Sequence, residues 1–364
     1  MTFAFFGASL VSGYTNGAVT YVRGVLRALA ERGHVVRFYE PIDDERLARR
    51  DILDPSWAEI VRFTADGAGV EAALDDAHDA DVIVKSSGIG VFDDLLEGAV
   101  PQCTRTDALA VYWDLDPAAT LTRIESDANY PLRAQLPWYD LVLTRIGDDE
   151  MVEAFERIGV QTCFPVYNAL DADVHHPEAA SPQPRATLLY MGHRHADRDV
   201  QVQQAFFDVA VRMPTHRFLL AGCGWESVSM PSNVDYLGYV YTAEHNLYHC
   251  STLAALNLTD AGSAALGYAP TARLFEAAGA ATCVISDAWT GIDAFFDPGR
   301  EVLIARETAE IVEQLCGLGA DRAGAIGRRA RWRSRIEHTY ARRAAELEAL
   351  LEGLDRQWAS KTAL

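Results

Sequence analysis

Residues 267–289 hold the densest group of side chains able to bind a charged ligand. Pro270 and Thr271 are typical of a helix start. Arg273 and Glu276 follow, three residues apart and therefore on one face of that helix. The carboxylate could accept both hydroxyls of a ribose, and the arginine and the helix N-terminus could bind phosphate. The same spacing also fits an ordinary salt bridge worth roughly 0.2–0.5 kcal/mol, so both interpretations stay open.

A second candidate is the segment 190–198, Tyr-Met-Gly-His-Arg-His-Ala-Asp-Arg, between a predicted strand and a predicted helix. His193, Arg194 and Arg198 bring positive charge to a helix start in an otherwise acidic chain. The planar guanidinium group suits phosphate because it can donate two parallel hydrogen bonds. An exposed polar loop is the alternative. His193 and His195 could also bind zinc, but no third ligand follows at a useful spacing.

Asp114 and Asp116 follow the apolar residues 111–113, which predict a strand. Two carboxylates at a strand end could hold a divalent metal that bridges a nucleoside diphosphate. Asp116 could instead cap the helix that Pro117 begins, or contact an acceptor hydroxyl as a polar partner or general base. All three interpretations stay open, and Asp116 is our candidate catalytic carboxylate.

Three glycines, Gly7, Gly13 and Gly17, separate the first predicted strand from a helix whose apolar stripe starts at Val19. Free backbone N–H groups at such a helix start can bind an anion. The spacing lacks the G-x-G-x-x-G dinucleotide fingerprint, and no Walker lysine follows. The glycines therefore fit either a tight turn or a ligand contact, with Gly13 as the candidate donor contact.

The 364 residues suggest two domains, and apolar runs alternate with amphipathic helical patterns in both halves. This alternation predicts βαβ units and parallel sheets. Strands are predicted in the first half at residues 3–6, 35–39, 81–84, 110–113, 141–144 and 162–166. In the second half they are predicted at 187–190, 218–221, 234–237, 254–258, 282–285 and 302–304. Residues 171–185 are rich in proline and predict a hinge between domains 1–170 and 186–325.

Residues 326–364 keep the helical spacing of apolar side chains to the end and predict one long helix. The helix carries a run of arginines, at positions 328, 329, 331, 333, 335, 342 and 343. These arginines could form a surface for an anionic partner. They could equally form a solvated helix face that pairs with the acidic body of the protein.

The composition narrows the class of protein. Lys and Arg number 32 against 52 Asp and Glu, a formal charge of −20 that disfavours binding to nucleic acid or anionic lipid. No stretch approaches the roughly 18 apolar residues of a membrane span, and the N-terminus lacks the basic start of a secretory signal. The six cysteines form no C-x-x-C pair, which argues against a zinc or redox motif. We expect a cytoplasmic protein. Six histidines have no identifiable partner in the sequence and are expected to be surface or satisfied structural residues: His34, His78, His175, His176, His216 and His249.

Taken together, the motifs resemble the GT-B glycosyltransferases, and more narrowly their spore-maturation (CgeB-like) branch. The nucleotide-sugar signature is carried by Arg273-Leu-Phe-Glu276-Ala-Ala-Gly279 and Val284-Ile-Ser-Asp287-Ala-Trp289-x-Gly291. The resemblance extends over nearly the whole chain. It includes Phe5-Phe6-Gly7, Arg32-Gly33-His34-Val35, Asp114-Leu-Asp116 with Thr120-Leu121, Tyr190-Met-Gly192 with Arg198, Asn257-Leu258, Gly267-Tyr268, Phe296-x-Pro298-Gly299-x-Glu301, and His338-Thr339 with Arg343.

The resemblance implies two facing Rossmann-like domains with parallel sheets, and a C-terminal helix (326–364) that crosses back to the N-terminal domain. The C-terminal domain would bind a nucleotide sugar and the N-terminal domain an acceptor. Glu276 would bind the donor ribose, while Arg198 and Arg273 would neutralise its diphosphate. The donor-binding set would also include Gly13, Gly267 and Tyr268, and the catalytic residues would be His193 and Asp116.

Two positions depart from the pattern. Tyr268 stands where related retaining enzymes carry a glutamate that contacts the donor sugar, so the sugar and the stereochemical outcome do not carry over. Pro117 comes earlier than the proline expected after the Asp-x-Asp, which bears on the role of Asp116. GT-B enzymes usually need no metal, and the resemblance therefore implies that none is required.

We therefore expect a metal-independent glycosyltransferase, of the hexosyltransferase type, with no cofactor and no nucleic-acid partner. It would use a nucleoside diphosphate sugar as donor and a sugar, small molecule or protein as acceptor. A nucleotide-sugar epimerase on the same fold would convert the donor without an acceptor. A non-catalytic protein that binds sugar nucleotides would bind without turnover, and a metal-dependent transferase would lose activity in EDTA.

Overall fold

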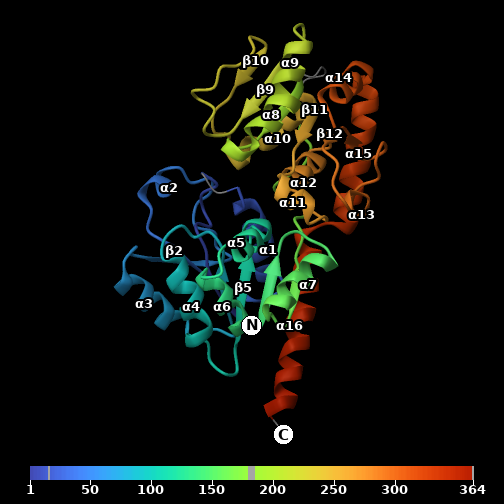
Figure 1. Cartoon of the computed structure of the whole chain (residues 1–364). Helices are drawn as coiled ribbons and strands as arrows, with labels where there is room; N and C mark the ends of the chain where they lie inside the picture. Colours follow the sequence, from blue (N-terminus) through green and yellow to red (C-terminus); the bar gives the residue numbers. More distant parts are fainter. Residues whose placement is uncertain (15–16, 179–184, 363–364) are drawn as a thin grey trace. The chain divides into compact units, whose positions relative to one another are not determined.

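The computed structural model describes residues 1–14, 17–178 and 185–362, with side chains up to Leu354. The chain forms two compact units, each built around one parallel sheet (Figure 1). The first unit comprises Met1–Ser12, Ala18–Tyr167 and Tyr340–Leu364, and the second comprises Gly13–Gly17 and Asn168–Thr339. Parts of three predicted features lie outside the described residues: 15–16 of the glycine loop, 179–184 of the hinge, and 363–364 of the last helix.

The first unit has a seven-stranded parallel sheet in the order β3-β2-β1-β4-β5-β6-β7. Its strands are β1 (Thr2–Phe6), β2 (Val35–Pro41), β3 (Glu59–Phe63), β4 (Val82–Ser86), β5 (Leu109–Asp114), β6 (Leu141–Thr144) and β7 (Cys163–Pro165). The edge strand β3 has no counterpart among the predicted strands, because it is only partly buried and its charged residues interrupt the apolar run. The other six lie where the alternation predicts them.

Helices connect these strands, and local signals set their ends. They are α1 (Val19–Glu31), α2 (Asp44–Ala48), α3 (Gly67–Ala77), α4 (Asp93–Cys103), α5 (Pro117–Ser126), α6 (Pro131–Gln135), a 3₁₀ turn (Leu136–Trp138) and α7 (Asp149–Ile158). At the start of α7 the Asp148 carboxylate accepts hydrogen bonds from the backbone N–H groups of Glu150 and Met151. The helix ends at Gly159, whose φ of 105° suits the left-handed C-terminal position.

The second unit has a six-stranded parallel sheet in the order β10-β9-β8-β11-β12-β13. Its strands are β8 (Ala186–Met191), β9 (Phe218–Ala221), β10 (Val234–Tyr236), β11 (Thr252–Asn257), β12 (Cys283–Ser286) and β13 (Leu303–Ile304). Leu188, Leu220 and Ile285 on these strands pack with Phe206 and Leu315 into one hydrophobic core. All six strands lie where the sequence pattern predicts them.

The helices of the second unit are mostly short. They are 3₁₀ turns at Ala196–Arg198 and Thr242–Glu244, α8 (Asp199–Val202), a π-helical turn (Gln203–Phe207), α9 (Asp208–Arg212), α10 (His245–Cys250), α11 (Ala261–Ala265), α12 (Ala272–Gly279), α13 (Ile292–Phe295), α14 (Thr308–Gly317) and α15 (Ala320–Glu337). The helix predicted over residues 200–213 is therefore interrupted by the π-helical turn. Thr271 and Gly279 bound α12 as predicted, because the Thr271 side chain caps its start.

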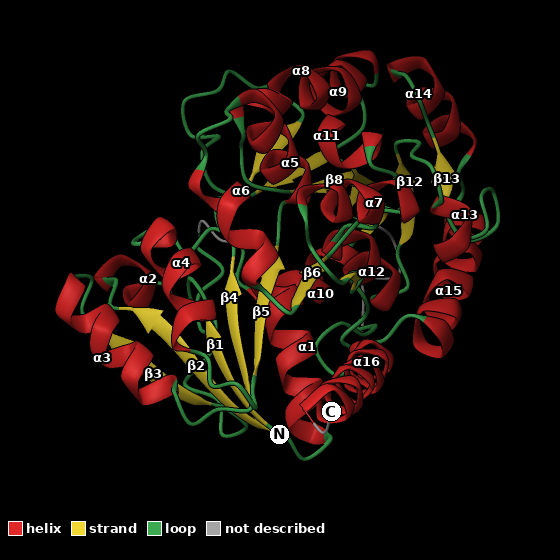
Figure 2. Ribbon diagram, turned by 60° about the horizontal axis from the view of Figure 1, so that its bottom comes forward, coloured by secondary structure: helices red, strands yellow, loops and turns green. Residues whose placement is uncertain are grey.

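The single long helix predicted over 326–364 is wrong in one respect: two helices, α15 and α16 (Tyr340–Thr362), meet at His338 and Thr339. The backbone N–H of Leu170 donates to the His338 carbonyl at 2.8 Å, which satisfies a carbonyl released at the break. α15 packs against α12 of the second unit, whereas α16 packs against α1 of the first (Figure 2). Neither of these helices, nor any other among the described residues, is long and apolar enough to cross a membrane.

The arginines of α15 do not all pair with acids. Arg333 lies 3.7 Å from Glu301 and 3.5 Å from Glu337, as a solvated helix face predicts. Three others form no ion pair with any described residue and line a pocket of about 630 Å³ together with the exposed Trp332; they are Arg328, Arg331 and Arg335. The paired helix face is therefore confirmed at Arg333, and the surface for an anionic partner stays a prediction.

Gly24 of α1 lies against the ring of Tyr340 in α16, and a Cβ atom at Gly24 would stand 2.2 Å from the ring. We expect Gly24→Ala to lower the free energy of unfolding by about 1–3 kcal/mol, because the helices must move apart. Gly353 is the matched control, since a Cβ there meets no atom within 4 Å. Gly353→Ala should be neutral or stabilise by up to about 1 kcal/mol. Urea unfolding measures both, and equal effects would contradict the packing of α16 on α1.

Candidate functional site

The predicted binding residues of the second unit gather where its strands end. The loops after β8, β9, β11 and β12 all leave the same edge of the sheet, since the strands are parallel and adjacent. In open α/β sheets ligands bind at this carboxyl edge. The residues of interest come from the loop after β8, the loop after β11 and the start of α12.

Arg273, in the first turn of α12, ties two strands together at this edge. Its guanidinium group donates to the Met191 carbonyl at 3.1 Å and to the Leu258 carbonyl at 3.4 Å. The group also lies over the Tyr190 ring, 5.8 Å from its centroid. The Arg273 Nε and the Tyr190 hydroxyl have no hydrogen-bond partner among the described residues. Both atoms are buried, so their hydrogen-bonding capacity is unused within the described part of the second unit.

Arg194 and Arg198 lie in the loop after β8, as predicted, but each already has an acidic partner. Arg194 forms a two-point contact with Asp199, with N–O distances of 2.9 and 2.5 Å. Arg198 lies 3.1 Å from Asp260, which follows β11. A phosphate bound by Arg198 would have to share this guanidinium group with the Asp260 carboxylate.

His193 is held in a defined orientation. Its Nδ1 accepts a hydrogen bond from the Cys223 backbone N–H at 3.0 Å, so a neutral ring carries its proton on Nε2. The ring stacks on Tyr239 with 6.0 Å between centroids. Position 222, next to Cys223, must be glycine, because a Cβ at Gly222 would stand 2.1 Å from the Gly192 carbonyl oxygen.

Gly267 and Tyr268 form a strained turn just before α12. Both have positive φ angles, 68° and 43°, and the left-handed region costs a tyrosine about 1–3 kcal/mol. The turn is held by the Tyr268 N–H, which donates to the Thr290 carbonyl at 2.7 Å. A Cβ at Gly291 would stand 2.7 Å from the Tyr268 ring. Such strain is often found at ligand sites, and it lies beside the start of α12.

Asp287 joins the ends of β11 and β12 to α8. Its carboxylate accepts from the Thr259 N–H at 2.8 Å and from the Gln201 side-chain amide at 3.1 Å. Burial raises the pKa of Asp287 from 3.8 to about 6, against the lowering effect of these hydrogen bonds. This residue belongs to the motif that carries the family resemblance, and the structure gives it a role in holding the edge of the sheet together.

Glu276 does not pair with Arg273, so the salt-bridge interpretation of their spacing is wrong. Its side chain is only 8% exposed, and its two oxygens face imidazole rings. Oε1 lies 3.9 Å from His175 Nε2, and Oε2 lies 3.6 Å from His245 Nδ1. Burial would raise the pKa of Glu276, but the neighbouring histidines, His245 first, hold it well below its usual range. The carboxylate is therefore ionised at neutral pH.

The histidines around Glu276 correct the expectation that His175 and His249 are surface or satisfied structural residues. Both are buried, and His175 Nδ1 and both ring nitrogens of His249 have no hydrogen-bond partner among the described residues. Burial lowers the pKa of His249 from 6.5 to about 3, so its ring is neutral. The signal in the sequence is the His-x-x-x-His spacing of His245 and His249, which places both on one face of α10.

Gly13 belongs to the second unit. It lies in the short segment Gly13–Gly17, which groups with Asn168–Thr339, whereas the preceding residues Met1–Ser12 belong to the first unit. Gly13 is buried. Gly7, in contrast, belongs to the first unit, where its N–H donates to the Tyr39 carbonyl at 3.0 Å.

In the first unit, Asp116 caps α5: its Oδ1 accepts from the Ala119 N–H at 3.3 Å. The capping interpretation is thereby confirmed, and the side chain is exposed. Asp114 is fully buried and accepts from the Asp116 N–H at 2.9 Å. The two carboxylates therefore have different surroundings, and Asp114 serves to shape the turn in which Asp116 lies.

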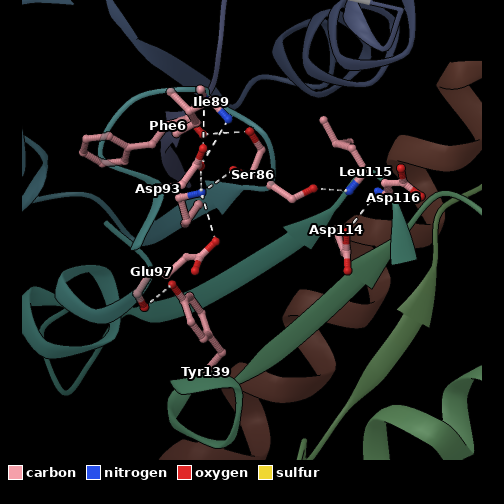
Figure 3. Close-up of polar contacts among 12 residues, drawn as sticks. Phe6, Ser86, Ile89, Asp93, Glu97, Asp114, Leu115, Asp116 and Tyr139 are labelled. Atoms are coloured by element: carbon pink, nitrogen blue, oxygen red, sulfur yellow. Dashed lines mark hydrogen bonds and ion pairs between the residues drawn. The ribbon is translucent and has the colours of Figure 1, made fainter. Parts of the chain in front are cut away.

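A buried lysine on β4, next to the strand that carries Asp114, was not among the predicted site residues. Lys85, the fourth residue of β4, donates to Asp93 at 2.6 Å and to the Ser86 carbonyl at 2.7 Å. It also lies 3.8 Å from Glu97, which Figure 3 shows on α4 below Asp93. Burial raises the pKa of Glu97 despite Lys85, and raises that of Asp114 to about 6. The sign of this cluster in the sequence is Lys85, a single charged residue that follows the apolar residues 82–84.

Comparison with known proteins supports the fold. Residues 195–349 match a protein-family model described as glycosyl transferase-like. This range holds Arg198, Gly267, Tyr268, Arg273 and Glu276. Among curated protein sequences, no match was found.

Several solved structures are similar over almost their full length. Sucrose-phosphate synthase from Thermosynechococcus elongatus has a TM-score of 0.70 and 14% identity, covering 97% of this chain and 99% of that one. HepE from Anabaena, in complex with UDP and glucose, gives the same values. AviGT4, a glycosyltransferase involved in avilamycin A biosynthesis, has a TM-score of 0.62 and 17% identity, covering 99% and 98%. The predicted GT-B fold, with two Rossmann-like parallel-sheet domains, is confirmed.

Asp114 generates a pH prediction. Its pKa rises from 3.8 to about 6 on folding, so its contribution to stability is present below pH 3.8 and is lost as the pH rises through about 6. Asp114→Asn copies the protonated form and should gain up to about 3 kcal/mol over the native protein above pH 7, but little at pH 4. Urea unfolding between these values measures the difference. Asp116→Asn, an exposed cap, is the control, and a pH-independent effect of Asp114→Asn would contradict the burial argument.

Proposed function

We propose that the protein is a glycosyltransferase that transfers a sugar from a nucleoside diphosphate sugar to an acceptor. The observation that carries this proposal is Arg273. Its guanidinium group is fixed at the carboxyl edge of the second sheet by carbonyl oxygens alone, and it forms no ion pair with a described residue. A cation held in this way favours an anionic ligand. The GT-B fold and the match of residues 195–349 to a glycosyl transferase-like family support the same activity.

We assign the donor to the second unit. Arg273 and Arg198 would neutralise the diphosphate, with Gly13 and the strained turn at Gly267 and Tyr268 close to the donor. Glu276 is ionised and would accept the two ribose hydroxyls. The complex of HepE with UDP and glucose shows that a protein of this fold binds such molecules, which supports the class of donor proposed here.

The proposed chemistry is mainly electrostatic. As the bond between sugar and diphosphate breaks, negative charge develops on the departing diphosphate, and fixed arginines stabilise that charge. His193 and Asp116 are the proposed catalytic side chains, with Asp116 as partner or general base for the acceptor hydroxyl. We further propose that no metal takes part, that the transferred sugar is a hexose, and that the protein is a cytoplasmic member of the CgeB-like branch.

Replacing Arg198 tests the diphosphate assignment. Because a hydrogen bond to a charged group contributes about 1.5–3 kcal/mol, we expect Arg198→Gln to raise the dissociation constant of the preferred nucleoside diphosphate at least about tenfold. Isothermal titration with UDP, GDP and dTDP measures this constant. The matched control is Arg217→Gln, which removes an exposed arginine paired with Asp235 in the same unit. Unchanged affinity in folded Arg198→Gln protein would remove Arg198 from the donor site.

Metal independence is tested separately. The thermal stabilisation given by the preferred nucleoside diphosphate should be the same with and without magnesium, because arginines take the place of the cation. A ligand at about 100 times its dissociation constant stabilises the folded state by about 2.7 kcal/mol, enough to move the melting temperature by a few degrees. Stabilisation that requires magnesium, or transfer that EDTA abolishes, would favour a metal-dependent enzyme.

A further inference from the structure

The cluster around Glu276 has the composition of a metal site. His175 lies within the predicted hinge segment 171–185, His245 begins α10, and Glu276 lies in the second turn of α12, so three separate segments bring them together. One ligand atom from each lies within 4.8 Å of the others. The side chains are 3%, 13% and 8% exposed, respectively. An imidazole–imidazole–carboxylate group this enclosed is unlike an acidic surface patch.

The separations between these atoms can be compared with those around a bound ion. The nitrogen–oxygen separations of 3.9 Å and 3.6 Å exceed hydrogen-bonding range. Zinc binds imidazole nitrogen at about 2.0–2.1 Å and carboxylate oxygen at about 2.0–2.2 Å, so two ligands of a tetrahedral ion stand roughly 3.4 Å apart. The three ligand atoms lie within 4.8 Å of one another, and the two histidines face different oxygens of the carboxylate, so the side chains would move closer together to bind one ion.

We propose that His175, His245 and Glu276 bind a divalent transition-metal ion of the zinc class, and that this ion competes with the donor ribose for Glu276. Two imidazoles and one carboxylate are a ligand set that zinc uses, with a fourth position left open. Magnesium prefers oxygen ligands and is excluded by the same set. The competition rests on the ribose role proposed above, whereas the ion binding does not.

The ion site is tested by titrating zinc chloride into the full-length, tag-free protein after treatment with a chelator. We expect one zinc ion per chain, no binding of magnesium, and affinity reduced at least about tenfold by His175→Gln or His245→Gln. His216→Gln is the matched control, because His216 is exposed and lies on another segment. Absence of stoichiometric binding, or equal loss in the His216 variant, overturns the site.

A second readout covers the case in which a variant does not fold. Cobalt(II) added to the native protein should give the intense visible absorption of a four-coordinate ion, and zinc should displace it. The weak spectrum of hydrated cobalt overturns the site without any substitution.

The competition has its own measurement. Saturating zinc should raise the dissociation constant of UDP for the native protein but not for His245→Gln. Zinc binding with unchanged UDP affinity overturns the competition and supports the ion site alone. Zinc binding by a protein that binds no nucleoside diphosphate contradicts the proposed function while it supports the ion site.

Discussion

The second unit depends on the contact between one guanidinium group and two carbonyl oxygens. Arg273 donates to Met191, at the end of β8, and to Leu258, just beyond β11, and these two strands are paired neighbours in the sheet. Carbonyl groups at the end of a strand have lost their ladder partners, so the arginine satisfies them and fixes the start of α12 at the same time. Gly192 makes this possible, because a Cβ there would stand 2.5 Å from the guanidinium nitrogen.

Lys85 in the first unit and Arg273 in the second have different partners. In the first, Lys85 is surrounded by carboxylates, and the cluster with Asp93 and Glu97 holds no surplus positive charge. In the second, Arg273 donates to two neutral carbonyls and forms no ion pair with a described residue. In a chain of net charge −20, this local difference supports the proposed position of an anionic donor.

The fold was predictable because its signals are local. Alternating apolar runs located twelve strands, and Thr271 and Gly279 marked the ends of α12. Features that depend on contacts between residues far apart in the sequence could not be predicted from local patterns. At the break before Tyr340 the His338 carbonyl accepts from the distant Leu170, and β3 is an edge strand without an apolar run. Neither feature has a periodic pattern of its own.

The candidate site was predictable in its residue types but not in its pairings. Their spacing predicted that Arg273 and Glu276 lie on one helix face. In the structure the Arg273 side chain donates to a carbonyl at a strand end, whereas the Glu276 side chain lies next to histidines. His175 lies 101 residues before Glu276 in the sequence, and no spacing rule connects positions so far apart. Only the His-x-x-x-His pair on α10 gave a local sign of this cluster.

The most direct test of the central claim is hydrogen–deuterium exchange of the native protein with and without UDP, GDP and dTDP. Binding at the carboxyl edge of the second sheet predicts slower exchange in residues 190–201 and 257–275 with at least one of them. These segments carry Arg198, the strained turn at Tyr268 and Arg273. Unchanged exchange in both segments, or protection confined to the first unit, would contradict the assignment of the donor to this edge.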